Sequence, residues 1–278
     1  MNYQIVHLNE IFPQLINESG DPALRVYLPD NLEEMGRQNQ KRPCLLICPG
    51  GGYAFCSQRE AEPVAFHFLP EGFNVFILNY SVAPHQFPTQ LREVAAAVEL
   101  IHSHAEEWHC DTKRVAIMGF SAGGHLAAHY STCYDWQEVR DIFPDSKPVQ
   151  ASILCYPVIS ADPSVAHMGS FQRLLGHIPL TPDETERFSC NLQVTEHTPP
   201  AFLWHTAADE TVPVMNSLLY AQALAKNKVP FALHIYPCGR HGLATVDQQT
   251  NVQLNPSTAH ATDWLDAAKK WLRITFGL

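Results

Sequence analysis

The sequence predicts an α/β protein in which helices cover both faces of a mostly parallel sheet. From Pro43 onward, short apolar runs rich in β-branched and aromatic residues alternate with longer segments whose apolar residues recur every three or four positions. The short runs are bounded by Pro or Gly, which is typical of buried parallel strands. With 278 residues, of which 46% are hydrophobic and 17% charged, the chain can bury a large core. Disordered and low-complexity architectures are therefore excluded.

The expected elements follow in a regular order. Two weaker strand candidates, Tyr3–Leu8 and Leu24–Leu28, come first and are expected to form an antiparallel edge of the sheet. The buried strands are expected at Cys44–Cys48, Phe73–Asn79, Val115–Gly119, Ala151–Val158, Ala201–His205 and Phe231–Tyr236. The helices are expected at Glu60–Leu69, Thr89–Glu107, Ala122–Tyr134, Asn216–Lys226 and Ser257–Arg273. This alternation predicts one α/β domain over residues 1–278.

One connection is far longer than the others. Residues 160–200 separate two expected strands, whereas connections in compact domains have a median of about five residues. The segment contains a helix candidate at Ser170–Leu175 and a second helix start at Thr181, with Pro in its first turn. We therefore expect a small helical cap over the carboxyl edge of the sheet, where open α/β sheets bind ligands. The alternative is a structural excursion with no role in binding.

Charge and composition argue against several classes of protein. Lys and Arg number 18 against 28 Asp and Glu, a formal net charge of −10, and no basic run occurs. Nucleic-acid binding and attachment to an anionic membrane are therefore not expected. The N-terminus has no signal-peptide pattern, and no apolar stretch reaches membrane-spanning length. The eight cysteines are scattered singly, as thiols in a reducing compartment are, so a cytoplasmic location is expected.

The most specific local pattern is Gly-x-Ser-x-Gly. Residues 119–124 read Gly-Phe-Ser-Ala-Gly-Gly, follow the apolar run 115–118 and open a helix. A tight strand–turn–helix junction needs small residues on both sides of the serine, and it exposes the serine hydroxyl above the sheet. We therefore predict that Ser121 is a nucleophile and that the Ala122 amide, at the helix N-terminus, faces a developing oxyanion.

A serine nucleophile needs a base, and the base needs an acid that orients it. His241 is the predicted base because it follows the last expected strand, on a loop that returns to the carboxyl edge of the sheet. Asp209 is the preferred acid because its strand immediately precedes the one that leads to His241, whereas Asp162 begins the long insertion. The alternative role for Asp209 is to cap the following helix.

Two further motifs bear on the site. Residues 49–53, Pro-Gly-Gly-Gly-Tyr, directly follow a buried strand, and their glycines let the backbone approach a substrate and turn its amides inward. The alternative is a flexible turn; no phosphate-loop pattern accompanies the glycines. His125 and His129 have the spacing of two ligands on one helix face, but no HExxH motif or nearby acidic ligand accompanies them, so no metal is expected.

These motifs, in this order, resemble the α/β-hydrolase esterases, near the acetyl-esterase and xylan-esterase-like carboxylesterases and the related hormone-sensitive-lipase-like group. The resemblance spans much of the chain and is carried by residues 49–53, 59–65 and 119–125, by Asp209–Pro213 with Asn216 and Ser217, and by His241 and Gly242. The sequence departs from the hormone-sensitive-lipase-like pattern at Pro49, where that pattern has His. The departure points to the acetyl-esterase-like branch.

The resemblance implies a serine carboxylesterase that hydrolyses short-chain, acetyl-type esters, with acetylated sugars among the candidates, through an acyl-enzyme on Ser121. It implies a triad of Ser121, Asp209 and His241, and no metal or organic cofactor. The oxyanion hole would be formed by the amides of Gly51, Gly52 and Ala122.

Tyr53 and Tyr80 are candidates to line the pocket, although aromatic residues near such sites are as often part of the core. The expected partner is a small-molecule ester, and a homo-oligomer is left open. The alternative functions are a small peptidase or a lipase on the same fold, or a non-catalytic ligand-binding protein, and the last is disfavoured because His241 is present.

Overall fold

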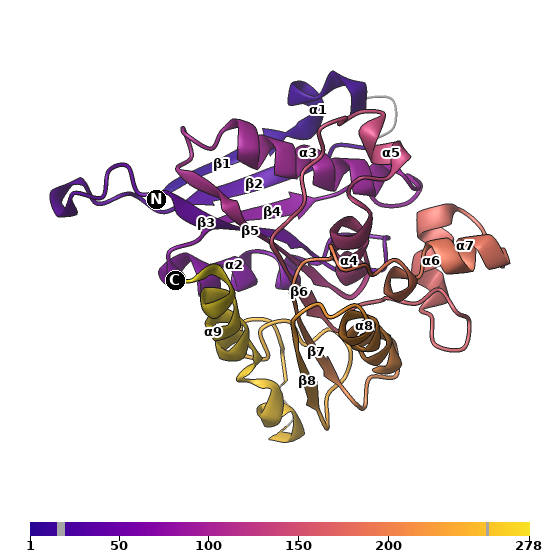
Figure 1. Cartoon of the computed structure of the whole chain (residues 1–278). Helices are drawn as coiled ribbons and strands as arrows, with labels where there is room; N and C mark the ends of the chain where they lie inside the picture. Colours follow the sequence, from indigo (N-terminus) through magenta and orange to yellow (C-terminus); the bar gives the residue numbers. More distant parts are fainter. Residues whose placement is uncertain (16–19, 254–255) are drawn as a thin grey trace.

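A computed structural model describes residues 1–15, 20–253 and 256–278 (Figure 1). An eight-stranded sheet runs through its centre, in the strand order β1-β2-β4-β3-β5-β6-β7-β8. The strands are β1 (Asn2–His7), β2 (Ala23–Leu28), β3 (Arg42–Cys48), β4 (Asn74–Asn79), β5 (Cys110–Phe120), β6 (Ala151–Cys155), β7 (Ala201–Thr206) and β8 (Phe231–Tyr236). β2 pairs antiparallel with both of its neighbours, β1 and β4, and the other neighbouring strands pair parallel. The predicted mostly parallel sheet with an antiparallel edge is confirmed.

Helices cover both faces of the sheet, as predicted (Figure 1). One face carries α3 (Thr89–Ser103), α4 (Ser121–Cys133) and α8 (Met215–Lys226), and the other carries α2 (Glu62–Phe68) and α9 (Trp264–Phe276). Short helices α1 (Leu8–Ile11) and α5 (Gln137–Arg140) complete the body. Because side chains alternate along a strand, each buried strand contributes to two cores. In β3, Cys44, Leu46 and Cys48 belong to one, and Leu45 and Ile47 to the other.

Several element boundaries differ from expectation for local reasons. The strand expected over 151–158 ends at Cys155, because Tyr156 has φ 37 and turns the chain out of the sheet. The helix expected from Thr89 to Glu107 ends at Ser103, and the residues after it form turns that lead into β5. Most of the segment expected to begin the last helix forms a 3₁₀ helix, Pro256–Ala261, before α9.

The long connection between β6 and β7 forms α6 (Met168–Leu175) and α7 (Pro182–Arg187), which stand away from the sheet beyond α4 (Figure 1). The helix start predicted at Thr181 is confirmed by a capping box, in which Thr181 Oγ1 accepts from the Glu184 amide and the Glu184 carboxylate accepts from the Thr181 amide. The Arg187 guanidinium lies 4.6 Å from the Trp136 ring and pairs with Glu138. These two contacts join α7 of the insertion to the segment around α5.

None of the helices in the described ranges is both long and apolar enough to cross a bilayer. All eight cysteines are free thiols, and six of them are buried.

Candidate active site

The turn between β5 and α4 holds Ser121 at the carboxyl edge of the sheet. Ser121 has φ 53, a left-handed conformation that residues with a side chain rarely adopt. A Cβ at position 119 would lie 2.1 Å from the Gly123 carbonyl oxygen, and a Cβ at position 123 would lie 2.2 Å from the Cys48 carbonyl oxygen. Only glycine fits at either position, which gives the physical reason for the Gly-x-Ser-x-Gly pattern.

The structure brings Ser121, His241 and Asp209 together although they come from three different loops. His241 Nε2 lies 2.7 Å from Ser121 Oγ, and His241 Nδ1 lies 2.6 Å from Asp209 Oδ2. An ionised carboxylate can only accept, so Nδ1 donates to Asp209 and Nε2 is left to accept from the serine hydroxyl. This is the tautomer that a general base needs in order to take the proton of Ser121.

Asp209 is held as a carboxylate by its surroundings. Burial raises its pKa, but hydrogen bonds from His205 and His241 outweigh this effect and hold the pKa well below its usual range. Its other oxygen accepts the amides of Thr211 and Val212, each at 2.9 Å. These amides lie in the turn before α8, so the carboxylate also stabilises that turn. It does not cap α8, which begins at Met215 with no side-chain hydrogen bond at its N-cap, so the alternative role as a helix cap is wrong.

Asp162, the other candidate acid, lies outside this cluster. It is exposed, and Oδ1 accepts from the backbone amide and the hydroxyl of Ser164 at 2.9 and 2.8 Å. It occupies a local turn at the start of the insertion.

Buried side chains anchor the glycine loop after β3. The Tyr80 hydroxyl donates to the Pro49 carbonyl at 2.7 Å, and the Gly50 amide donates to Glu60 Oε2 at 2.9 Å. The Tyr53 hydroxyl lies 2.9 Å from His125 Nδ1. These contacts explain how the loop is anchored with Pro49 at its start.

The next two glycines of this loop, Gly51 and Gly52, line the same cavity as Ser121. They have φ 127 and 62, and a Cβ at position 51 would lie 1.9 Å from the Phe55 carbonyl oxygen. Because α4 begins at Ser121, the amide of Ala122 lies in the first turn and has no acceptor within its own helix. Gly51 and Gly52 thus share a cavity with Ser121, and Ala122 directly follows Ser121 in the chain.

Tyr53 and Tyr80 lie behind the glycine loop rather than in the cavity. Their side chains are 1% and 3% exposed, and neither is among the residues that line the Ser121 cavity. Burial raises the pKa of both phenols, which therefore stay protonated and donate the hydrogen bonds that fix the loop.

The cavity at Ser121 has a volume of about 350 Å³ and a lining that combines polar and apolar groups. His167 and Arg173 reach it from the insertion, and the Arg173 guanidinium donates to the Gly52 carbonyl at 3.3 Å. Sequence reasoning missed both, because their contact with the site depends on how the insertion folds back. The complete lining is Gly51, Gly52, Ala54, Phe55, Ser57, Arg59, Glu60, Ser121, His167, Arg173, Thr211, His241 and Gly242.

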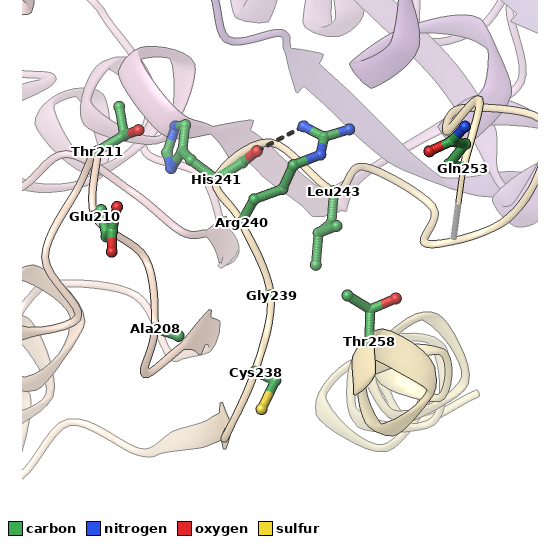
Figure 2. A pocket seen from close by; sticks show the side chains of 10 residues that line it. All are labelled: Ala208, Glu210, Thr211, Cys238, Gly239, Arg240, His241, Leu243, Gln253 and Thr258. Carbon is green, nitrogen blue, oxygen red and sulfur yellow. Dashed lines mark hydrogen bonds between the residues drawn. The ribbon is translucent and has the colours of Figure 1, made fainter. Parts of the chain in front are cut away.

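A second cavity, of about 490 Å³, lies beside the first and shares Thr211 and His241 with it. Figure 2 shows its lining residues, which come from the loop that carries Glu210 and Thr211, from the loop that carries Arg240 and His241, and from the segment that carries Gln253 and Thr258. The Arg240 guanidinium donates to the His241 carbonyl at 3.0 Å. The two cavities therefore lie next to one another around the predicted base.

The pair His125 and His129 is buried in the core. His125 accepts from Tyr53 at Nδ1 and donates from Nε2 to the Phe188 carbonyl at 3.1 Å. Within residues 1–15, 20–253 and 256–278, no three His, Cys, Asp or Glu side chains gather in an arrangement that could hold a metal ion. Burial lowers the pKa of His125 to about 4.

This shift predicts an acid-dependent loss of stability. Above pH 6.5 His125 is neutral in both states, whereas below it the unfolded chain binds a proton that the folded protein does not. We expect His125 to remove about 2 kcal/mol from the free energy of unfolding between pH 7 and pH 5, with the loss levelling off near pH 4. Urea unfolding at several pH values measures it. The pH dependence of the free energy of unfolding should become weaker in His125→Asn and should stay unchanged in His197→Asn, which replaces an exposed histidine. An unchanged pH dependence in His125→Asn would contradict the lowered pKa of His125.

The comparisons with known proteins agree with this geometry. A model of the family described as BD-FAE matches residues 24–224. The chain belongs to the BD-FAE family. In this BD-FAE protein the matched region contains the glycine loop, the Ser121 turn and Asp209. The predicted resemblance to the acetyl-esterase and xylan-esterase-like carboxylesterases of the α/β-hydrolase fold is confirmed.

Curated relatives of this BD-FAE protein include endo-1,4-beta-xylanase B of Butyrivibrio fibrisolvens, 37% identical over 84% of this chain and 37% of that protein. The acetylxylan esterase of Xylanibacter ruminicola is 32% identical over 82% of this chain and 45% of its own length. The chain thus spans less than half the length of these two relatives.

Solved structures match over nearly the whole chain. The acetyl ester-xyloside bifunctional hydrolase from Caldicellulosiruptor lactoaceticus has a TM-score of 0.83 and 34% identity, covering 99% of this chain and 96% of its own. A carboxylesterase from Lactobacillus plantarum also has a TM-score of 0.83, with 29% identity, covering 99% of this chain and 98% of its own.

Proposed function

We propose that this BD-FAE protein is a serine carboxylesterase that hydrolyses short-chain, acetyl-type esters of polar alcohols, acetylated sugars included. The observation that carries the proposal is the hydrogen-bonded chain from Ser121 through His241 to Asp209, next to a glycine loop that borders the same cavity.

In the proposed reaction, His241 takes the proton of Ser121 as the serine oxygen attacks the ester carbonyl. The negative charge that develops on the carbonyl oxygen is stabilised by the amides of the oxyanion hole at Gly51, Gly52 and Ala122. The protonated His241 then gives its proton to the leaving alcohol, and an acyl-enzyme remains on Ser121. Water, activated by His241, hydrolyses the acyl-enzyme and regenerates the serine.

The cavity lining supports a polar alcohol. Arg59, His167, Arg173 and Thr211 all reach the space around Ser121, and such groups favour an alcohol with several hydroxyls over a hydrocarbon chain. Two similar proteins, one named an acetylxylan esterase and the other an acetyl ester-xyloside bifunctional hydrolase, support the same substrate class. We place the part of the alcohol farther from the ester in the second cavity, past Thr211 and His241.

Cleavage of glycosidic bonds is not part of the proposal. Glycosidases use two carboxylates that flank the scissile bond. Of the described residues that line the Ser121 cavity, Glu60 alone carries a carboxylate, and both of its oxygens already accept hydrogen bonds.

A panel of p-nitrophenyl esters tests the acyl preference. We expect kcat/KM to be highest for acetate through butyrate and to fall for octanoate and palmitate, because a cavity of about 350 Å³ is too small to bury a long acyl chain. Ser121→Ala supplies the background rate, and acetic acid release from acetylated xylo-oligosaccharides tests the alcohol. Rates that climb steadily from butyrate to palmitate would instead indicate a lipase.

A further inference from the structure

We infer that Glu60 and Tyr156 are positioning residues of this site, which together set the oxyanion loop and the His241 loop in one fixed arrangement. The inference rests on the proposed function, because it assigns these residues to the esterase reaction. Their hydrogen bonds do not go to the predicted reacting atoms. Glu60 acts through the Gly50 amide, and Tyr156 acts through the Ala244 amide and the His241 ring.

Glu60 is a buried carboxylate with a defined partner for each oxygen. It ends the 3₁₀ segment Gln58–Glu60 before α2, and it is only 3% exposed. Oε2 accepts from the Gly50 amide at 2.9 Å, and Oε1 accepts from the Tyr156 hydroxyl at 2.7 Å. Burial of a carboxylate is costly unless it is hydrogen-bonded, so the side chain is held firmly by these two donors.

Tyr156 extends the contact of Glu60 to the His241 loop. Burial raises the pKa of Tyr156, so the phenol stays protonated and donates a hydrogen bond to Glu60. The phenol oxygen also accepts from the Ala244 amide at 3.0 Å. The Tyr156 ring lies edge-on to the His241 imidazole, with 5.1 Å between ring centroids. Tyr156 therefore packs its ring against the imidazole of His241 and binds the backbone of the same loop at Ala244.

The backbone of Tyr156 indicates that this placement has a cost. Tyr156 directly follows β6 and has φ 37, in the left-handed region that side-chain-bearing residues avoid. Residues in such conformations persist where the surrounding structure holds them, and they cluster at functional sites. Here the conformation places the Tyr156 hydroxyl between Glu60 and Ala244.

The contact at Gly50 bears directly on the oxyanion hole. Gly50 shares a peptide unit with Gly51, so a shift of the Gly50 backbone also turns the Gly51 amide. A Cβ at position 50 would lie 2.6 Å from Glu60 Oε2 and 2.8 Å from the Phe120 carbonyl oxygen, which shows how closely the loop lies on Glu60. The neighbouring Arg59 adds to this arrangement, because its guanidinium donates to the Gly242 carbonyl at 2.9 Å.

These contacts predict an effect on kcat rather than on KM. The oxyanion donors and the base act most strongly in the transition state, so a small displacement of either lowers kcat while substrate binding changes little. Glutamine at position 60 retains one acceptor, for either Gly50 or Tyr156 but not both. Phenylalanine at position 156 keeps the ring against His241 and removes only the hydroxyl.

The experiment measures p-nitrophenyl acetate hydrolysis by the wild-type chain, Glu60→Gln, Tyr156→Phe and the double variant. We expect kcat to fall about 10- to 100-fold in Glu60→Gln and about tenfold in Tyr156→Phe, with KM within about threefold. The double variant should lose less than the product of the single losses, since both substitutions remove the same hydrogen bond.

The matched control is Glu62→Gln. This glutamate lies two residues farther along, and its carboxylate also accepts from a tyrosine, Tyr27, at 2.9 Å, but away from the site. It should keep wild-type kcat. If Glu60→Gln does not fold, Tyr156→Phe alone decides, because it removes a single oxygen.

The outcomes separate the two proposals. An inactive wild-type chain would contradict the proposed function. An active wild-type chain with normal kcat in folded Glu60→Gln and Tyr156→Phe would overturn the positioning role alone, as would losses confined to KM or matched by the control.

Discussion

Replacing Ser121 with alanine should leave a folded protein that has lost nearly all esterase turnover. The substitution removes the oxygen that lies 2.7 Å from His241 Nε2 and that forms the acyl-enzyme in the proposed reaction. We expect kcat for p-nitrophenyl acetate to fall on the order of 10⁶-fold, the size of loss known when a serine hydrolase loses its nucleophile. The remaining rate would come from binding and from the oxyanion donors.

A serine on the same helix supplies the control. Ser131 is buried in α4, and its hydroxyl donates to the Ala127 carbonyl at 2.7 Å. Ser131→Ala should keep normal turnover and should still react with a fluorophosphonate probe, whereas Ser121→Ala should not be labelled. Full activity in folded Ser121→Ala would rule out the acyl-enzyme.

The second large effect is expected at Asp209. An asparagine there keeps the shape of the side chain but presents an amide, so it no longer fixes the tautomer of His241 or stabilises the imidazolium that forms during the reaction. By analogy with the same substitution in serine proteases, we expect kcat to fall on the order of 10⁴-fold. Steady-state kinetics on purified Asp209→Asn measures it, with thermal unfolding to establish that the protein is folded.

Asp162→Asn is the matched control, because Asp162, like Asp209, lies a few residues after a strand of the sheet, here β6, but its carboxylate bonds within its own turn, to Ser164. It should show near-normal turnover. The reverse pattern, with a collapse at position 162 and little change at 209, would move the acid to the start of the insertion and contradict the hydrogen bond at His241.

The predicted triad residues could be picked out from sequence because each depends on local pattern and chain order. A Gly-x-Ser-x-Gly run between a strand and a helix leaves few conformations, and the clashes at positions 119 and 123 explain why. Parallel strands bring their carboxyl ends to one edge, so the loops after β7 and β8 were expected to be neighbours. Asp209 and His241 come from these two loops.

The supporting residues could not be found in this way. Tyr156 is 96 residues from Glu60 in sequence, and no local sequence pattern around either residue predicts the hydrogen bond between them. Tyr53 and Tyr80 are candidates from sequence to line the pocket, but their side chains are buried in the core, where packing decides orientation. The insertion residue Arg173 reaches Gly52 across 121 positions, a contact that only the folded insertion creates.

The hydrogen bonds of His125 have a consequence for protein engineering. A single imidazole connects Tyr53 in the glycine loop to the Phe188 carbonyl in the insertion, across α4. The insertion is therefore not an interchangeable module, and grafting one from another esterase would leave this imidazole without its acceptor unless a carbonyl returns to the same place. Insertions that retain the residues around Phe188 and differ only on the surface of α6 would keep the His125 hydrogen bond. They would change only the residues that α6 presents near the Ser121 cavity.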